Sequence, residues 1–298
     1  MYNVTIFGIH LKLKPIAFTL PIGNGWDIYW YGIIIATGFL LALLYGYKNA
    51  KRFNLDLDRV LDVVLVSTPV AILCARSYYL IFDGEKLESF SDFFGFGNSG
   101  FSGLAIYGAV IGAFLSGLIM CIIRKVKILD MFDLGSMGFL IGQGIGRWGN
   151  FMNQEAFGGP TGSSWWGMTS ENVRSDFLML GYDENALAHP CFLYESIWCI
   201  IGFFVINKFS KNRKFSGQIV LMYGVWYGFG RAIIELLRTD SLMIGRLKVS
   251  CLLSVVIAVT SLILLIVFYK RSSENENTGD YLPIMAEEIK ETDENDDN

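Results

Sequence analysis

Charged side chains within apolar stretches are the feature of this sequence that most needs a chemical explanation. An ionised side chain at the centre of a bilayer costs roughly 2.5–3.5 kcal/mol on insertion scales, so such residues usually mark a function. Here they are arginines and glutamates, within or at the ends of long apolar runs: Arg76, Arg147, Glu155, Glu195, Arg231, Glu235 and Arg238.

Three of these charges lie on one predicted helix. Glu235 follows Arg231 by four residues and Arg238 follows it by seven, so all three share a helix face. One interpretation is an ion pair that joins helices. The alternative is a binding site, because two arginines against one glutamate leave a positive charge that suits phosphate.

A second group occupies residues 146–158, which read GRWGNFMNQEAFG. Arg147 can make a forked contact to a phosphate, and the amides of Asn150 and Asn153 suit ester or glycerol oxygens. The glycines let the backbone approach a ligand closely. A glycine-rich turn at the end of a helix is the simpler interpretation, but Arg, Asn and Glu within nine residues favour a site.

The surrounding sequence predicts a membrane protein. Hydrophobic residues make up 53% of the 298 positions, and apolar runs recur at the length that spans a bilayer. Only helices satisfy their backbone in lipid without neighbours. We therefore expect an all-α polytopic bundle of about seven transmembrane helices, with spans at residues 28–47, 60–82, 101–123, 131–146, 192–209, 217–237 and 249–269.

Basic residues between the predicted spans give the orientation. They gather after the first, third, fifth and seventh spans, which places the N-terminus outside and the C-terminus in the cytoplasm. The loop after the sixth span, with Arg238, Arg246 and Lys248, fits this rule less well, so those charges have a candidate role of their own.

The charge distribution divides the chain into a body and a tail. We expect a transmembrane catalytic domain over residues 1–271, with an extracytoplasmic insertion at 154–190, and an acidic, disordered cytoplasmic tail over 272–298. The tail has ten acidic residues and one lysine, so the net charge of −4 becomes about +5 for the body. A basic membrane body suits anionic lipid head groups and gives no reason to expect nucleic acid.

The motifs together resemble a known family. Residues 146–158 resemble the signature of the prolipoprotein diacylglyceryl transferases, integral membrane enzymes of bacteria. Further motifs of the same family are similar to residues 29–32 (YWYG), 75–82, 102–108 (SGLAIYG), 189–195 (HPCFLYE) and 227–238. Each is weak alone, but six in order are specific, and only the tail and the arm after Gly158 lie outside.

This resemblance implies an enzyme of the bacterial plasma membrane that begins lipoprotein maturation. The sn-1,2-diacylglyceryl group of phosphatidylglycerol passes to the thiol of the lipobox cysteine in a prolipoprotein signal peptide, a thioether forms, and glycerol phosphate leaves. No metal or soluble cofactor is implied. The partners are phosphatidylglycerol, the prolipoprotein and membrane lipid.

The residues suit that chemistry, because fixed arginines stabilise the charge that gathers on a leaving phosphate. We expect Arg147 and Arg231 to hold the phosphate, with Glu155 and Glu235 orienting them. The predicted lipid-binding residues are Arg147, Asn150, Asn153, Tyr31, Arg76, Arg238 and Gly158.

The group that takes the thiol proton is left open. Many relatives have histidine where this chain has Tyr107, and a phenol with a pKa near 10 is a poorer base unless positive charge lowers that pKa. Either Tyr107 acts in such a field or another group takes the proton. His10 is expected at the surface, and His189 is expected to hydrogen-bond locally.

Two other classes of protein fit intramembrane charges. A transporter or lipid flippase also places Arg and Glu along its path, but such folds often repeat, and the 146–158 segment has no second copy. An assembly protein held together by buried ion pairs is the third possibility.

Overall fold

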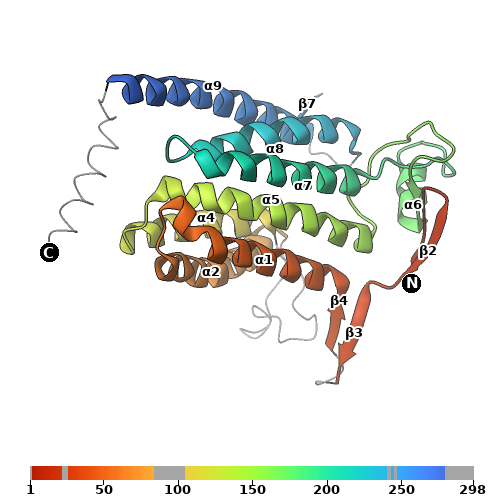
Figure 1. The fold of residues 1–298 in the computed structure, drawn as a ribbon. Coiled ribbons are helices and arrows are strands. Elements are labelled where there is room, and N and C mark those ends of the chain that lie inside the picture. Colours follow the sequence, from red (N-terminus) through yellow and green to blue (C-terminus); the bar gives the residue numbers. More distant parts are fainter. Residues whose placement is uncertain (1, 22–25, 84–104, 240–242, 245–246, 279–298) are drawn as a thin grey trace.

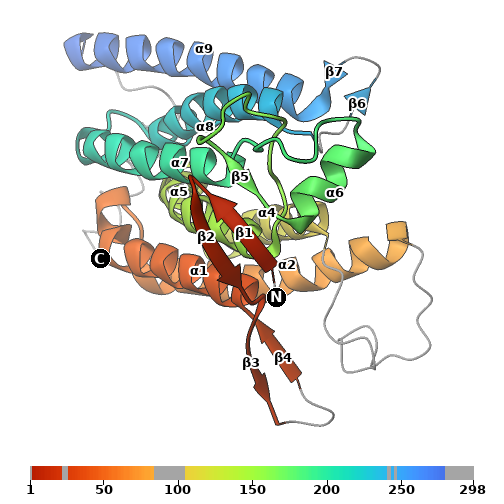
Figure 2. The ribbon, with the colours of Figure 1, turned by 90° about the vertical axis from the view of Figure 1, so that its right-hand side faces the viewer.

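Long helices packed side by side make up most of the molecule (Figures 1 and 2). A small head, made of residues 2–13 and 154–190, lies at one end of the helices. The structure is a computed structural model, and it describes residues 2–21, 26–83, 105–239, 243–244 and 247–278. The long helices are α1 (Trp30–Asn49), α2 (Leu57–Asp83), α4 (Ile106–Ile123), α5 (Ile128–Asn153), α7 (Cys191–Phe209), α8 (Gln218–Leu237) and α9 (Val249–Thr278). Short 3-10 turns, η1 (Ala50–Phe53) and η2 (Ser210–Asn212), follow α1 and α7.

Five of these helices are long and apolar enough to cross a membrane: α1, α2, α7, α8 and α9. The apolar part of α4 is shorter. The apolar sequence of α5 is interrupted by polar residues and glycines. This fits its place at the centre of the bundle, where it packs against α1, α7 and α8. The prediction of a mostly helical membrane protein is therefore confirmed.

Three predicted boundaries change. The fourth predicted span, 131–146, is part of a longer helix, α5, so Arg147 and Asn150 lie on a helix and not in a turn. The third begins at Ile106, and residues 101–104 lie outside the described part. Helix α9 continues to Thr278, so the prediction that disorder begins at residue 272 is wrong for residues 272–278. A helix need not end where its apolar residues end. Residues 279–298 lie outside the description.

The all-α prediction missed a small β structure in the head. Strands β1 (Tyr2–Ile6) and β2 (Ile9–Leu13) form an antiparallel hairpin, and β1 also pairs with β5 (Met168–Thr169). The pairing joins the N-terminal segment to the insertion, beside helix α6 (Glu171–Met179), as Figure 2 shows. Alternating apolar residues explain β1, where Val4 is buried against Phe177 and its neighbours. Two further hairpins are β3 (Ile16–Leu20) with β4 (Trp26–Tyr29), and β6 (Met243–Ile244) with β7 (Leu247–Lys248).

Helices α5, α7 and α8 are held together by close contacts. A Cβ on Gly144 would lie 3.3 Å from Ile200 Cγ1, and that close approach lets Ser196 Oγ donate to the Gly144 carbonyl at 2.7 Å. Trp198 and Trp226 stack with ring centroids 4.6 Å apart, and each indole N–H donates to the other residue's carbonyl, at 2.9 and 3.0 Å. These contacts fix α7 against α5 and α8, which carry the predicted site residues Arg147, Asn150, Asn153, Arg231 and Glu235.

A buried ion cluster fixes the same helices at the end away from the head. Arg213 Nη1 lies 2.5 Å from Asp130 Oδ1 and 2.9 Å from Asp133 Oδ2. Asp133 also accepts hydrogen bonds from the backbone N–H groups of Gly217 (2.9 Å) and Val220 (2.8 Å), at the start of α8. The carboxylate of Asp133 on α5 therefore caps the start of α8 and pairs with Arg213, in the segment before α8.

Replacing Asp133 with asparagine should destabilise the bundle. Removing one member of a buried charge group leaves the others uncompensated, which costs about 3–5 kcal/mol. The exposed pair of Arg124 and Asp62 provides the control, because Asp62→Asn should cost less than about 1 kcal/mol. Unfolding by SDS titration in mixed micelles measures both variants. Equal losses would show that the buried cluster has no special weight.

Candidate active site

Predicted site residues of α5 and α8 meet Glu195 of α7 at the head end of the bundle. Arg147 and Asn150 lie in the last two turns of α5, and Glu195 lies in the second turn of α7. Tyr227, Arg231 and Glu235 follow one another at intervals of four on α8, so they share one face. We call the linked side chains the arginine cluster: Arg147, Asn150, Glu155, Glu195, Tyr227, Arg231, Glu235 and Arg238.

Glu195 is the centre of the arginine cluster. Its Oε1 accepts from Arg147 Nη2 at 2.5 Å and from the Tyr227 hydroxyl at 3.1 Å. Its Oε2 accepts from Arg231 Nη1 at 3.0 Å. Glu195 stands among the charges of the apolar runs, but no role was predicted for it. The available signal was a glutamate near the start of an apolar span, a position that requires a partner.

The two glutamates that were assigned roles differ in how directly they act. Glu235 Oε2 lies 2.6 Å from Arg231 Nη2 and 4.0 Å from Arg238 Nε, so it contacts one arginine directly and lies near a second. Glu155 contacts Arg147 through Asn150. Asn150 Nδ2 donates to Glu155 Oε1 at 2.8 Å, and Asn150 Oδ1 accepts from Arg147 Nη1 at 3.1 Å.

Asn153 completes this end of the cluster, because its Nδ2 lies 3.4 Å from Glu155 Oε1. The turn that brings Glu155 back is made by Gln154, which ends α5 in the left-handed conformation at φ 57°. Its backbone places the Glu155 N–H 3.1 Å from the Asn150 carbonyl. The end of α5 and the start of the insertion thus form one hydrogen-bonded unit.

The charges in the cluster are balanced in number but not in accessibility. Three arginines face three glutamates, so the positive surplus predicted from residues 231–238 does not hold for the cluster as a whole. However, the side chains of Arg147 and Arg231 are 20% and 15% exposed, against 3% for Glu195 and 2% for Glu235. Around Glu195 and Glu235 the charge that a ligand can reach is therefore cationic, which suits an anion such as phosphate, whereas Glu155 at the edge of the cluster is an exposed carboxylate.

Tyr31 of α1 also belongs to this region. A Cβ on Gly149 would lie 2.8 Å from Tyr31 Cδ2, so the tyrosine ring occupies the space that only glycine leaves on α5. The predicted role of Tyr31 in binding lipid stays a prediction.

Arg76 and Tyr107 are placed by a different pair of helices. Arg76 of α2 is 2% exposed, and its guanidinium carbon lies 5.5 Å from the centroid of the Tyr79 ring. Tyr107, the second residue of α4, is 61% exposed, and its ring centroid is 6.3 Å from that of Tyr78. In the described part of the chain, the contacts of Tyr107 are with α2 and not with the arginine cluster. Its role stays a prediction.

Gly158 holds the insertion against the end of α8. Its N–H donates to the His189 carbonyl at 2.9 Å, and a Cβ there would lie 2.7 Å from the Leu237 carbonyl oxygen. His189 Nδ1 lies 3.2 Å from the Tyr194 hydroxyl, in agreement with the expected local hydrogen bond. Burial lowers the pKa of His189, which favours the neutral imidazole.

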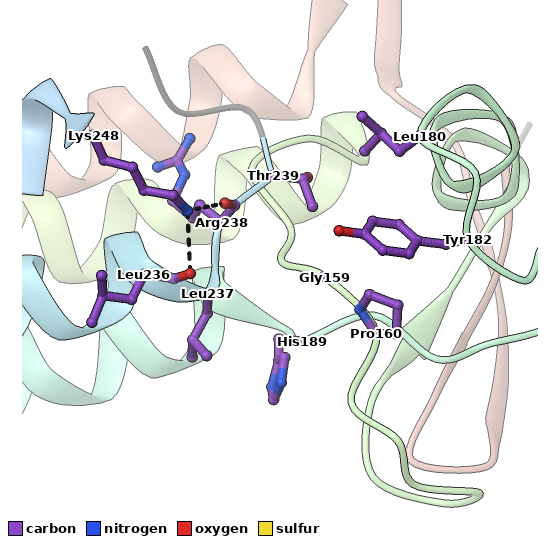
Figure 3. A pocket seen from close by; sticks show the side chains of 10 residues that line it. All are labelled: Gly159, Pro160, Leu180, Tyr182, His189, Leu236, Leu237, Arg238, Thr239 and Lys248. Carbon is purple, nitrogen blue, oxygen red and sulfur yellow. Dashed lines mark hydrogen bonds between the residues drawn. The ribbon is translucent and has the colours of Figure 1, made fainter. Parts of the chain in front are cut away.

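A pocket of about 400 Å³ opens between the insertion and the end of α8 (Figure 3). Arg238, Thr239 and Lys248 line one side, and Pro160, Leu180 and Tyr182 line the other. The phenol of Tyr182 points toward Thr239. A second pocket of about 320 Å³ is lined by Glu155, residues of α6 and the same Thr239. The two pockets therefore reach the arginine cluster at Arg238 and Glu155, and Arg147 and Arg231 line neither of them.

Comparison with known proteins covers this whole region. Residues 15–267 match the family described as prolipoprotein diacylglyceryl transferase. Three relatives carry the name phosphatidylglycerol–prolipoprotein diacylglyceryl transferase. That of Limosilactobacillus reuteri (strain DSM 20016) is 40% identical over 263 residues, which cover 87% of this chain and 93% of the relative. That of Clostridioides difficile (strain 630) is 39% identical (88% and 98% covered), and that of Clostridium novyi (strain NT) is 37% identical (89% and 99%).

Replacing Glu195 with glutamine should destabilise the protein, because Arg147 and Arg231 would then lose their shared counter-charge. We expect a loss of about 3–5 kcal/mol, the usual effect of breaking a buried pair. Glu171→Gln, on the exposed first turn of α6, is the control and should cost less than about 1 kcal/mol. Thermal unfolding in detergent compares the two midpoints. A Glu195→Gln midpoint equal to that of the control would contradict a central role for this carboxylate.

Proposed function

Since the chain belongs to the prolipoprotein diacylglyceryl transferase family, which catalyses the first step of lipoprotein maturation, we propose how its arginine cluster performs that transfer. The donor is phosphatidylglycerol and the acceptor is a prolipoprotein. The observation that carries the proposal is the pair Arg147 and Arg231, which reach from two helices to one buried carboxylate and keep their exposed surface for an anion.

The reaction exchanges one bond for another. The sulfur of the lipobox cysteine attacks the carbon of the diacylglyceryl group to which the phosphate of phosphatidylglycerol is attached. The carbon–sulfur bond forms, the carbon–oxygen bond to phosphate breaks, and glycerol phosphate leaves with the electron pair. The thiol proton passes to an acceptor, since the thiolate and not the thiol is the nucleophile.

The arginines act on the leaving group. Negative charge gathers on the phosphate as the carbon–oxygen bond breaks, and two guanidinium groups already in place stabilise that charge in the transition state without reorganising. Glu195 and Glu235 hold the guanidiniums in position, because the attraction between a carboxylate and a guanidinium is stronger in apolar surroundings than in water.

The remaining predicted residues bind and orient the lipid. Asn150 and Asn153 offer amides to ester or glycerol oxygens, and Tyr31 supports the wall of the site formed by α1. Arg238 extends the cationic surface towards the pocket, and Gly158 places the insertion close to it. Arg76, buried on α2, is assigned to the lipid on the family resemblance.

The proposed topology has seven spans, and the head lies outside a bacterial plasma membrane. Helices α4 and α5 cross the membrane together with α1, α2, α7, α8 and α9. The head lies at one end of the bundle in Figure 1, and the α1–α2 and α7–α8 connections lie at the other. The arginine cluster lies at the head end, because its members are in the last turns of α5 and α8 and near the start of α7. Those connections carry the basic residues that favour the cytoplasmic side. A secreted cysteine would then meet the arginine cluster directly. Residues 1–271 form the catalytic unit in this proposal.

The transfer assay tests the arginine pair. Proteoliposomes with radiolabelled phosphatidylglycerol and a lipobox peptide should yield labelled peptide with the parental enzyme. Arg147→Ala and Arg231→Ala should each lower the rate by about 10²–10³-fold or more, because each removes a donor to the developing charge. Arg124→Ala, in the exposed pair at the opposite end, should transfer at the parental rate. Parental rates in either site variant would contradict the assignment.

Tyr107→Phe tests the proton acceptor separately. Tyr107 is one candidate for the general base and another group is the alternative; loss of a general base lowers the rate by about 10²–10⁴-fold. Phenylalanine retains the ring beside Tyr78, so packing of α4 on α2 should persist. The same assay, with the amount of inserted protein measured alongside, decides the matter. A parental rate would assign the proton to another group and leave the arginine pair unaffected.

A further inference from the structure

Helix α8 ends at the arginine cluster, and its last carbonyls have unusual partners. A helix leaves its final four carbonyls without intrahelical N–H partners. Here the Leu237 carbonyl accepts from Gly159 N–H of the insertion at 2.8 Å. The carbonyls of Glu235 and Leu236 accept from the ammonium of Lys248, at 2.9 and 3.1 Å. The end of α8 is thus held by two other segments of the chain.

Lys248 commits all of its donors to this backbone. Its third hydrogen bond goes to the carbonyl of Arg238 at 2.6 Å, and Figure 3 shows the side chain reaching across to the end of α8. An ammonium has three donors and no acceptor. Lys248 therefore has no donor left for a ligand, although it lines the pocket, and any effect it has must act through the residues it holds.

The backbone held by Lys248 carries two members of the arginine cluster. Glu235 lies 2.6 Å from Arg231 and 4.0 Å from Arg238, so a shift of the last turn of α8 would move the partner of both arginines. The ammonium also offsets the negative end of the helix dipole, which would otherwise face the site that must receive an anion.

We propose that Lys248 is a positioning residue for the transfer reaction, which fixes the end of α8 so that Glu235 and Arg238 keep the cationic surface aligned on the leaving phosphate. This inference rests on the proposed function and adds a residue from the connection before α9. It also explains the basic charge that did not fit the orientation rule: Lys248 serves the site.

Lys248→Met tests the proposal in the proteoliposome assay. Turnover per folded enzyme should fall about tenfold, while the apparent KM for phosphatidylglycerol changes less than about twofold, because the lost alignment acts on the transition state. Lys248→Arg, which keeps a cation with several donors, should recover turnover to within about threefold of the parent. Lys208→Met, an exposed lysine near the end of α7, is the matched control and should equal the parent.

A double variant shows whether Lys248 acts through Arg238. If it does, adding Lys248→Met to Arg238→Lys should lower turnover by no more than about twofold beyond Arg238→Lys alone, because coupled positions are not additive. Losses that multiply would overturn the proposal. So would parental turnover per folded Lys248→Met enzyme with a lowered melting temperature, which would make the lysine a stability cap only.

The outcomes separate this inference from the function on which it rests. Transfer by the parental enzyme with unchanged turnover in Lys248→Met refutes the positioning role and leaves the transferase function intact. Absence of transfer by the parental enzyme, with folded protein in the liposomes, refutes the proposed function and the positioning role together.

Discussion

One buried carboxylate, that of Glu195, organises the functional end of this protein. It binds arginines from two other helices, one through each oxygen, and its side chain is almost completely covered. Two guanidinium groups in apolar surroundings would repel one another and would be costly to desolvate singly. Sharing a counter-charge brings both arginines to one place and leaves their outer surfaces available to an anion. The arrangement of α5, α7 and α8 follows from this requirement.

The rest of the fold keeps those three helices in register. The ion cluster of Arg213, Asp130 and Asp133 caps α8 and joins it to α5 at the end away from the head. The reciprocal tryptophan pair joins α7 to α8 midway. At the head, the sheet and the insertion close over the ends of the helices. The site therefore sits on helices fixed at both ends, as preorganised electrostatic stabilisation requires.

The sequence predicted the helical bundle and most of the site because apolar length and intramembrane charge are strong local signals. The face shared by Arg231 and Glu235 follows from helical spacing alone. Glu195 was given no role because its two partners lie 48 and 36 residues away, and only tertiary packing brings them together. The strand β1 was missed because a hairpin of two five-residue strands gives a weak pattern beside long apolar runs. The place of Tyr107, against α2, likewise depends on packing that spacing does not show.

The central claim is that Arg147 and Arg231 act as one unit through Glu195. The most direct measurement is the coupling between Arg147→Lys and Arg231→Lys in the transfer reaction, from the turnover of the parent, both single variants and the double variant. A shared unit predicts that the double variant loses at least about tenfold less than the product of the single losses, because the first substitution already disrupts the unit. A double loss equal to that product would show that the two arginines work independently and would contradict the claim.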